Sequence, residues 1–409
     1  MRRRLRGLRR RLHHRLRQLR GLRPMKIVFI SKYPPIEGYV SSCTYWLARG
    51  LASRGHDITV VTNAFEVEDA DREWLEAEDL DIYQTGRLRV RNTDPFQQYR
   101  LIPAANPFCE KLAAAAIERA ADADILDAWY YVSYGAAGLL AKAATGLPLV
   151  LRHAGSDIGR LAANPHMRPL ISAMLKKADA VISTGASRAR LAGLGAPRSR
   201  MRTIPVSVDT EAFNPSAKKA ILDAPEDVPV VCCIGKVSRG KGIPQLLAAA
   251  SRVKGDFRLL FVSSDSQGLR QLTLHCGLKR KLLFKMFVPP WSMPGIIRAS
   301  RAVVMPEHDF PVPGHSPILP REVLACGTCL VISAELRGKV AEGALSDGEN
   351  ALVAEPARTA ELASRLSIAV QDEDAARRIG ALGRRLSARI EDFEGYVSAN
   401  ERLHRELAG

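Results

Sequence analysis

Short apolar runs rich in β-branched residues alternate along the chain with longer segments in which apolar residues recur every three or four positions. The short runs are typical of strands buried on both faces, and the longer segments are typical of amphipathic helices. This alternation predicts parallel sheets covered by helices on both faces. The predicted strands are Lys26–Ser31, Asp57–Thr62, Leu88–Arg91, Ile125–Ala128, Leu149–Arg152, Ala180–Ser183, Val228–Ile234, Phe257–Val262, Leu282–Val288, Ala302–Met305 and Cys329–Ser333.

The series of strands and helices is interrupted around Ile204–Pro215, where two prolines and a loss of periodicity indicate a link between two halves. Helices are predicted at Ser41–Gly55 in the first half and at Pro244–Val253 in the second, and the tail from about Ala360 is helical and charged. We therefore predict an α/β protein with two Rossmann-like, doubly wound domains that face one another across a cleft.

Residues 1–24 differ from the rest of the chain. Eleven of them are Arg, none is acidic, and leucines recur at steps of three or four from Leu5 to Leu22. The pattern predicts a basic amphipathic helix, which would bind an anionic membrane surface through residues 2–23, or nucleic acid through its phosphates. A further alternative is that translation starts at Met25, where a strand begins, and that this arm is not native.

The composition is that of a soluble globular protein, because 46% of the residues are hydrophobic, 25% are charged and no run of 18 apolar residues occurs. Most of the formal charge of +17 lies in the arm, and the mildly basic body argues against nucleic-acid binding. The odd number of cysteines, seven, indicates reduced thiols in a cytosolic protein. Cys326 and Cys329 have C-x-x-C spacing between two apolar runs, and we interpret them as buried and structural.

The loop after strand Val228–Ile234 has the composition of an anion site. Its sequence, Gly235-Lys-Val-Ser-Arg-Gly-Lys-Gly242, opens a helix and contains Lys236 and Lys241. Glycines let the backbone approach a ligand, the start of a helix favours an anion, and two lysines add full positive charge. The loop therefore predicts a site for a diphosphate, although a solvated basic turn would have the same composition. The usual dinucleotide and Walker-type loops are absent.

Two further segments carry candidate chemistry. Glu322 falls in the first turn of a helix that begins near Pro320, where its carboxylate could accept two hydrogen bonds from a ribose diol. His153 opens the sequence His-Ala-Gly-Ser-Asp157 directly after strand Leu149–Arg152, at the sheet edge where open α/β sheets bind ligands.

Together with the Pro35-Ile-Glu-Gly38 loop and the segments Leu51–Thr62 and Ile204–Pro215, these motifs resemble the GT-B glycosyltransferases of family 4 in order and spacing, from Met25 to about Glu406. The resemblance implies retaining transfer of a sugar from a nucleoside-diphosphate sugar to a hydroxyl acceptor. It also implies the domain boundaries: an arm at 1–24, an acceptor domain at 25–208, a donor domain at 209–390, and a C-terminal helix at 391–409 that packs back on the N-terminal domain.

The resemblance assigns roles to individual residues. Lys236 and Lys241 match a basic pair that grips the donor diphosphate, with Lys236 standing where Arg is more usual. Glu322 matches the ribose ligand, and Gly38 matches part of a Gly-Gly loop at the donor phosphate, here followed by Tyr39. His153, Lys241 and Glu322 are the expected catalytic set. The residues expected around the transferred sugar are His153, Asp157, Gly314, His315 and Ser316.

One departure from the family pattern concerns Gly314, because the family usually has a Glu eight positions before Glu322. The missing carboxylate normally touches the donor sugar, and His315 and Glu307 are nearby but out of register. The donor sugar is therefore left open. Two alternatives remain: a nucleotide-sugar epimerase of the same fold, and a non-catalytic, membrane-docked nucleotide-binding relative.

The remaining expectations concern metals, acceptor and location. The triplets Asp69–Asp71, Asp79–Asp81 and Asp122–Asp124 lie in or beside polar segments, and we interpret them as solvated charge rather than as metal ligands. No metal or other cofactor is expected. The expected acceptor is a glycan or a lipid-linked glycan precursor in polysaccharide or glycolipid biosynthesis, and the expected location is the cytoplasm, peripheral to the inner face of the membrane.

Overall fold

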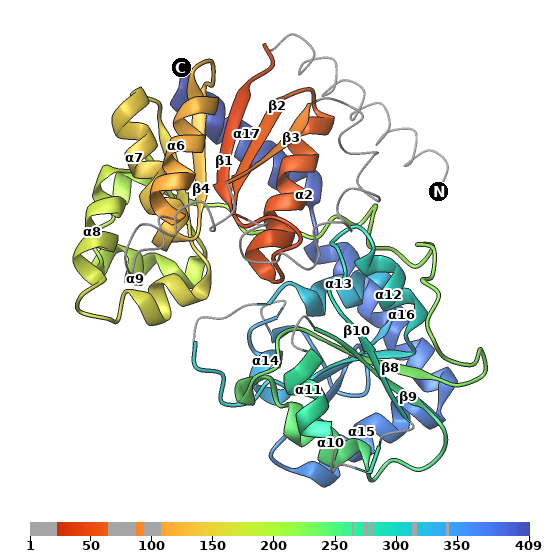
Figure 1. The fold of residues 1–409 in the computed structure, drawn as a ribbon. Coiled ribbons are helices and arrows are strands. Elements are labelled where there is room, and N and C mark those ends of the chain that lie inside the picture. The colour runs from red at the N-terminus through yellow and green to blue at the C-terminus, as the bar shows by residue number, and fades with distance from the viewer. Residues whose placement is uncertain are drawn as a thin grey trace.

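The computed structural model describes residues 23–63, 87–93, 108–263, 266–273, 277–278, 281–312, 317–340 and 343–409. These residues form two α/β domains, each built on one parallel sheet (Figure 1). The two sheets are joined by the segment after Thr203, and a second chain crossing leads back from the C-terminal domain at residues 391–392.

The N-terminal domain contains a seven-stranded sheet in the order β3-β2-β1-β4-β5-β6-β7, in which all neighbouring strands are parallel. Its strands are β1 (Lys26–Ser31), β2 (Asp57–Thr62), β3 (Leu88–Asn92), β4 (Ile125–Trp129), β5 (Leu149–Arg152), β6 (Ala180–Ser183) and β7 (Met201–Thr203). Its helices are α2 (Tyr39–Ser53), α6 (Phe108–Ala120), α7 (Ala136–Thr145), α8 (Arg168–Lys177) and α9 (Arg188–Gly193), with short turns η3 (Tyr131–Gly135), η4 (Asp157–Leu161), η5 (Gly185–Ser187) and η6 (Arg198–Arg200).

The C-terminal domain contains a six-stranded parallel sheet in the order β10-β9-β8-β11-β12-β13. Its strands are β8 (Val230–Ile234), β9 (Arg258–Val262), β10 (Leu282–Lys285), β11 (Ala302–Met305), β12 (Cys329–Ser333) and β13 (Leu352–Ala354). Its helices are α10 (Ile243–Ala250), α11 (Ser266–Thr273), α12 (Met293–Ala299), α13 (Leu319–Cys326), α14 (Ala334–Arg337), α15 (Thr359–Gln371) and α16 (Glu373–Ile390), with the turn η7 (Arg239–Lys241). The last helix of the chain is α17 (Phe393–Ala408).

The alternation of side chains along each buried strand divides the core into layers. In the N-terminal sheet, Phe29 and the other side chains on its face of the sheet pack against α2 and α17. Val28 and Ile30 pack against α6, α7 and α8 on the opposite face. The C-terminal sheet likewise packs α12 and α13 on one face, and α10 and α15 on the other. The first of these layers continues from one domain into the other, where the Tyr45 ring of α2 lies 4.9 Å from the Trp291 ring.

The hydrophobic pattern locates the strands well. Six strands begin and end where the sequence predicts, and the others differ by one to three residues at an end. The two strands that the pattern misses, β7 and β13, are only three residues long, so they are too short to show a periodicity. The two-domain α/β architecture with doubly wound parallel sheets is confirmed.

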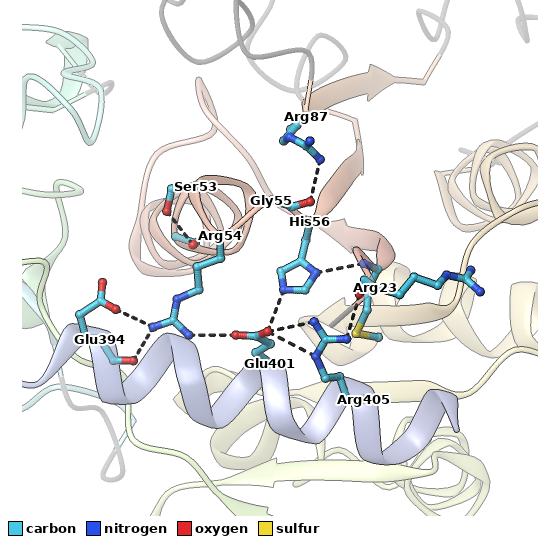
Figure 2. A network of polar contacts seen from close by, with 11 residues as sticks. Arg23, Ser53, Arg54, Gly55, His56, Arg87, Glu394, Glu401 and Arg405 are labelled. Atoms are coloured by element: carbon cyan, nitrogen blue, oxygen red, sulfur yellow. Dashed lines mark hydrogen bonds and ion pairs between the residues drawn. The ribbon is translucent and has the colours of Figure 1, made fainter. Parts of the chain in front are cut away.

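Helix α17 packs against α2 and β4 of the N-terminal domain rather than against its own neighbours in sequence (Figure 1). Figure 2 shows the polar network that holds it, centred on Glu401. The Glu401 carboxylate lies 3.1 Å from Nε2 of His56 and 3.0 Å from Nη1 of Arg54, and it also pairs with Arg405 of its own helix. Hydrogen bonds from His56, Arg54 and Arg405 lower the pKa of Glu401 to about 2.

A second, fully buried network ties α17 to the carboxyl end of β5. Arg152 donates two hydrogen bonds of 2.7 Å to Asp127 and a third, of 2.6 Å, to Asn400 of α17. Nε2 of His404 lies 2.7 Å from Asp127 as well. Because Arg152 directly precedes His153, this network fixes the strand end from which the His153 loop leaves the sheet.

Candidate functional site

A pocket lies in the C-terminal domain at the carboxyl ends of β8 and β11, between which the strand order of the sheet changes direction. Open α/β sheets bind their ligands at this point, because the loops on either side of it diverge. The pocket is lined by Cys233, Ile234, Gly235, Lys236, Lys241, Ile243, Val304, Met305, Pro306 and Glu307. The structure therefore brings Lys236 and Lys241 to one pocket.

Gly242 allows the loop to close tightly over this strand end. Its φ of +68° is left-handed, and a Cβ atom there would lie 1.8 Å from the carbonyl oxygen of Pro306. The residue therefore has to be glycine on grounds of both backbone conformation and space. Helix α10 begins at the next residue, so its amino end faces the same pocket as the two lysines.

The two lysines of the pocket differ in their surroundings. Lys236 is exposed, whereas Nζ of Lys241 pairs with the carboxylate of Glu307, a side chain that is 1% exposed. Lys241 also lies 4.9 Å from the ring centroid of Phe310. The sequence leads us to expect two ammonium groups directed at an anion, but in this structure Lys241 is already partnered by a buried acid.

Glu322 lies in the first turn of α13, as the sequence predicts, and is 4% exposed. Burial raises the pKa of its carboxyl to about 8; Arg321 lowers this value and Glu391 raises it. Among the described residues, no hydrogen bond to the Glu322 carboxyl is recorded. Burial is the main cause that raises the pKa of the Cys43 thiol, and the charge of Glu322 is the second cause. The Glu322 carboxyl therefore faces α2 across the domain boundary.

A small apolar cluster places α13 beside the start of α2. Val40, Cys43 and Trp129 of the N-terminal domain form its buried part, and Ile318, the residue before α13, packs against them. Gly38 precedes α2 with a φ of +119°, and a Cβ there would meet nothing within 4 Å. Its backbone conformation therefore requires glycine, while the space around it is open.

His153 is partly buried in the loop after β5. Its Nδ1 lies 3.3 Å from the carbonyl oxygen of Ala154, and its Nε2 lies 2.9 Å from Oγ of Ser187. The Ser187 hydroxyl also donates to the carbonyl oxygen of Thr184, at 3.1 Å, so either ring nitrogen of His153 can carry the proton within this network. Burial lowers the pKa of His153, so the imidazole is neutral.

Asp157, in the same loop, is buried and binds backbone N–H groups. Its carboxylate is completely buried and accepts hydrogen bonds from the backbone N–H groups of Ala154, at 3.0 Å, and Tyr131, at 3.3 Å. Burial raises its pKa to about 7. Asp157 therefore braces the His153 loop against the end of β4. A Cβ atom at Gly159, two residues on, would lie 3.0 Å from Cγ1 of Val312 in the C-terminal domain, so this loop borders the other domain.

Several sequence predictions lie outside the described residues or away from the pocket. Residues 313–316, which include Gly314, His315 and Ser316, are not among the described residues, and neither are 69–71, 79–81 and the arm as far as residue 22. Asp124 accepts a hydrogen bond from the backbone N–H of Lys26 at the start of β1. This is the amino end of the strands, opposite to the carboxyl end at which the candidate site lies. Cys326 and Cys329 are both buried free thiols.

Two acidic residues of the site, Glu307 and Glu391, have partners that the sequence does not reveal. Glu307 pairs with Lys241, and Glu391 makes a bidentate pair with Arg321, the residue before Glu322. Their partners are 66 and 70 positions away along the chain, so no local spacing reveals them. In the described part of the chain, no group of three His, Cys, Asp or Glu side chains could hold a metal ion, and no helix is long and apolar enough to cross a membrane.

Two family models match consecutive parts of the chain. The model described as Glycosyltransferase Family 4 matches residues 40–212, and the model described as Glycosyl transferases group 1 matches residues 216–386. The first match falls on the domain that contains His153, and the second falls on the domain that contains the lysine pocket and Glu322.

Individual proteins are similar over most of the chain. The D-inositol 3-phosphate glycosyltransferase of Xylanimonas cellulosilytica is 25% identical over 363 residues, covering 78% of this chain and 84% of that protein. The sucrose-phosphate synthase of Thermosynechococcus elongatus has a TM-score of 0.69 at 20% identity, covering 94% of this chain and 99% of that one. The HepE protein of Anabaena, crystallised with UDP and glucose, has a TM-score of 0.67 at 17% identity, covering 94% and 100%. At such identities, these structures show a shared fold.

Proposed function

The chain belongs to the glycosyltransferases of family 4 and group 1 and has their two-domain GT-B fold, and we propose that it transfers a sugar from a nucleoside-diphosphate sugar to a hydroxyl acceptor with retention of configuration. The observation that carries this proposal is the pocket at the β8–β11 switch point, where Lys236, Lys241 and the start of α10 converge. A diphosphate has the charge for such a site.

In the proposed reaction, negative charge develops on the leaving diphosphate while the sugar carbon becomes oxocarbenium-like. Lys236 and the amino end of α10 stabilise that charge because they are held in place before the reaction. Lys241 contributes although it is paired with Glu307, because an ammonium group has three N–H donors and can donate to a phosphate oxygen while keeping its carboxylate partner. The pair also holds the Lys241 side chain at the pocket.

The ribose of the donor would bind at Glu322. A carboxyl group with a pKa of about 8 is largely protonated at pH 7, and two hydroxyl donors from a ribose diol would favour its ionised form. Donor binding would then release a proton from Glu322. The cluster around Ile318 supports this assignment, because it keeps α13 beside the Gly38 turn, the expected backbone contact of the donor phosphates.

The neutral His153 and its braced loop would face the transferred sugar. Closure of the two domains around the donor would exclude water and align the acceptor hydroxyl. The HepE structures contain UDP and UDP-glucose, which makes UDP-sugars the first donors to test. Gly314 in place of the usual Glu leaves the identity of the sugar open.

We further propose that the reaction needs no metal ion and that the acceptor is a glycan or a lipid-linked glycan precursor in polysaccharide or glycolipid biosynthesis. The basic residues at 2–23 would hold the enzyme at the anionic inner face of the membrane, where a lipid-linked acceptor is found.

The proposal is tested by incubating the full chain with UDP-glucose and other nucleotide sugars, with and without candidate acceptors. We expect nucleoside diphosphate release that depends on the acceptor, and thermal stabilisation by the productive donor alone. Formation of an epimer from the donor without an acceptor would identify an epimerase instead. Thermal stabilisation by a nucleotide, with no turnover of any donor, would favour a non-catalytic relative.

A further inference from the structure

The side chain of Glu391 is completely buried at the point where the chain crosses between the domains for the second time. Its two carboxylate oxygens accept from Arg321 in a bidentate manner, with Nε to Oε1 at 2.7 Å and Nη2 to Oε2 at 2.6 Å. A bidentate guanidinium–carboxylate pair of this geometry fixes both the position and the orientation of the arginine.

The same carboxylate also holds the first crossing between the domains. Oε2 of Glu391 accepts hydrogen bonds from Oγ of Ser207, at 2.9 Å, and from the backbone N–H of Val208, at 2.8 Å. Arg321 completes the arrangement by donating from Nη1 to the carbonyl oxygen of Val206, at 2.9 Å. All three nitrogen atoms of the Arg321 guanidinium are therefore used within this cluster.

Arg321 is the neighbour of Glu322 in α13, and the two side chains interact electrostatically. Arg321 lowers the pKa of the Glu322 carboxyl, whereas Glu391 raises it. Glu322 itself is 4% exposed and has no recorded hydrogen bond among the described residues. The Glu322 carboxyl is largely protonated at pH 7, but the charge of a released Arg321 side chain would favour its ionised form and pair with it, and such a pair is strong where water is excluded.

We propose that Glu391 is a positioning residue that holds the Arg321 guanidinium on the interdomain linker, and thereby keeps Glu322 unpaired and available to a nucleotide ribose. The inference rests on the proposed function, in which Glu322 binds the ribose of the donor. Glu391 touches neither donor nor acceptor and acts only through Arg321.

The test compares two variants that break the same ion pair. Glu391→Gln leaves Arg321 charged but removes the carboxylate that binds it in a bidentate manner, whereas Arg321→Met removes the competing charge. Binding of UDP and of 2′-deoxy-UDP is measured by calorimetry at pH 7. For the native chain we expect UDP to bind at least 10-fold more tightly than 2′-deoxy-UDP. In Glu391→Gln we expect this ratio to fall below about 3-fold, because Arg321 then pairs with the Glu322 carboxylate and competes with the ribose.

Arg321→Met and the double variant Glu391→Gln/Arg321→Met are expected to keep the ratio at about 10-fold. A purely structural role for the ion pair predicts the opposite, namely equal losses from both single variants and no recovery in the double variant. Either of those results would overturn the proposal, as would an unchanged ratio in Glu391→Gln. If Glu391→Gln does not fold, Glu391→Asp, which is too short to hold both the guanidinium and Ser207, replaces it and is expected to reduce the ratio in the same direction.

The failure of this inference is distinguishable from that of the proposed function. If the native chain binds none of UDP, ADP and GDP, the proposed function itself is wrong. If the native chain discriminates UDP from 2′-deoxy-UDP and Glu322→Gln abolishes that discrimination while Glu391→Gln does not, the ribose assignment of Glu322 holds and only the positioning role of Glu391 fails.

Discussion

Replacement of Lys241 by Ala separates two effects that the structure combines in one side chain. The substitution removes an ammonium group from the pocket, and it takes the Lys241 partner away from the carboxylate of Glu307, a side chain that is 1% exposed. Loss of one preorganised positive group at a leaving diphosphate costs on the order of 3 kcal/mol in transition-state stabilisation, which is about 100-fold in kcat/KM.

The second effect is on folding. Removing one partner of a buried ion pair destabilises a protein by about 3–5 kcal/mol, because a charge is left in an environment of low dielectric constant. The Lys241 side chain is 21% exposed, so water compensates part of this loss and we expect a value near the lower limit. The matched control is Lys241→Ala/Glu307→Gln, which removes both charges and should recover most of the stability but not the activity.

The assay is the initial rate of nucleoside diphosphate release with a productive donor and acceptor, together with thermal unfolding of the same three proteins. A turnover of Lys241→Ala within a few-fold of the native value would refute the role of Lys241 at the diphosphate. Full recovery of activity in the double variant would also refute it, because Lys241 would then serve only to neutralise Glu307.

Three further predictions concern metal, pH and stability. Activity should persist in EDTA; a loss that Mn²⁺ restores would contradict the metal-free mechanism. Nucleotide affinity of the native chain, measured by calorimetry from pH 6 to pH 9, should increase relative to that of Glu322→Gln as the carboxyl ionises near its pKa of about 8, and parallel profiles for the two proteins would argue against ribose binding by Glu322. The lowered pKa of Glu401, about 2, means that this group stabilises the fold fully above its ordinary pKa and loses that contribution as pH falls toward 2. In urea unfolding, Glu401→Gln should therefore cost on the order of 3 kcal/mol at pH 7 and progressively less below pH 4, whereas a difference independent of pH would be the wrong outcome.

The sequence predicts the fold more completely than it predicts the site. Strands such as β11 and β12 are almost entirely apolar because both of their faces are covered, so composition alone locates them. Lys241 and Glu322 can likewise be predicted, since a glycine-rich turn and a helix start are local features. The buried acids nearby, Glu307, which pairs with Lys241, and Glu391, which pairs with Arg321, cannot be predicted, because they are set by the way distant loops meet in three dimensions.

The position of Asp157 illustrates the same limit. Its place in a loop after a strand favours contact with a ligand, yet the structure uses its carboxylate to satisfy two backbone N–H groups at the turn. A polar residue in such a loop is equally suited to binding a ligand and to holding the loop that does so. Only the three-dimensional arrangement distinguishes these roles.

The return of α17 to the first sheet has a consequence for dissecting the protein. Asp127 and Arg152 pair with each other, but their remaining buried hydrogen bonds are made with Asn400 and His404, so a fragment that stops before the linker would expose an apolar face and leave this buried ion pair incompletely hydrogen-bonded. The N-terminal lobe is thus not a contiguous stretch of chain, and during synthesis it stays unfinished until α17 has left the ribosome. A short deletion within α17 would therefore destabilise the N-terminal domain more than the C-terminal domain.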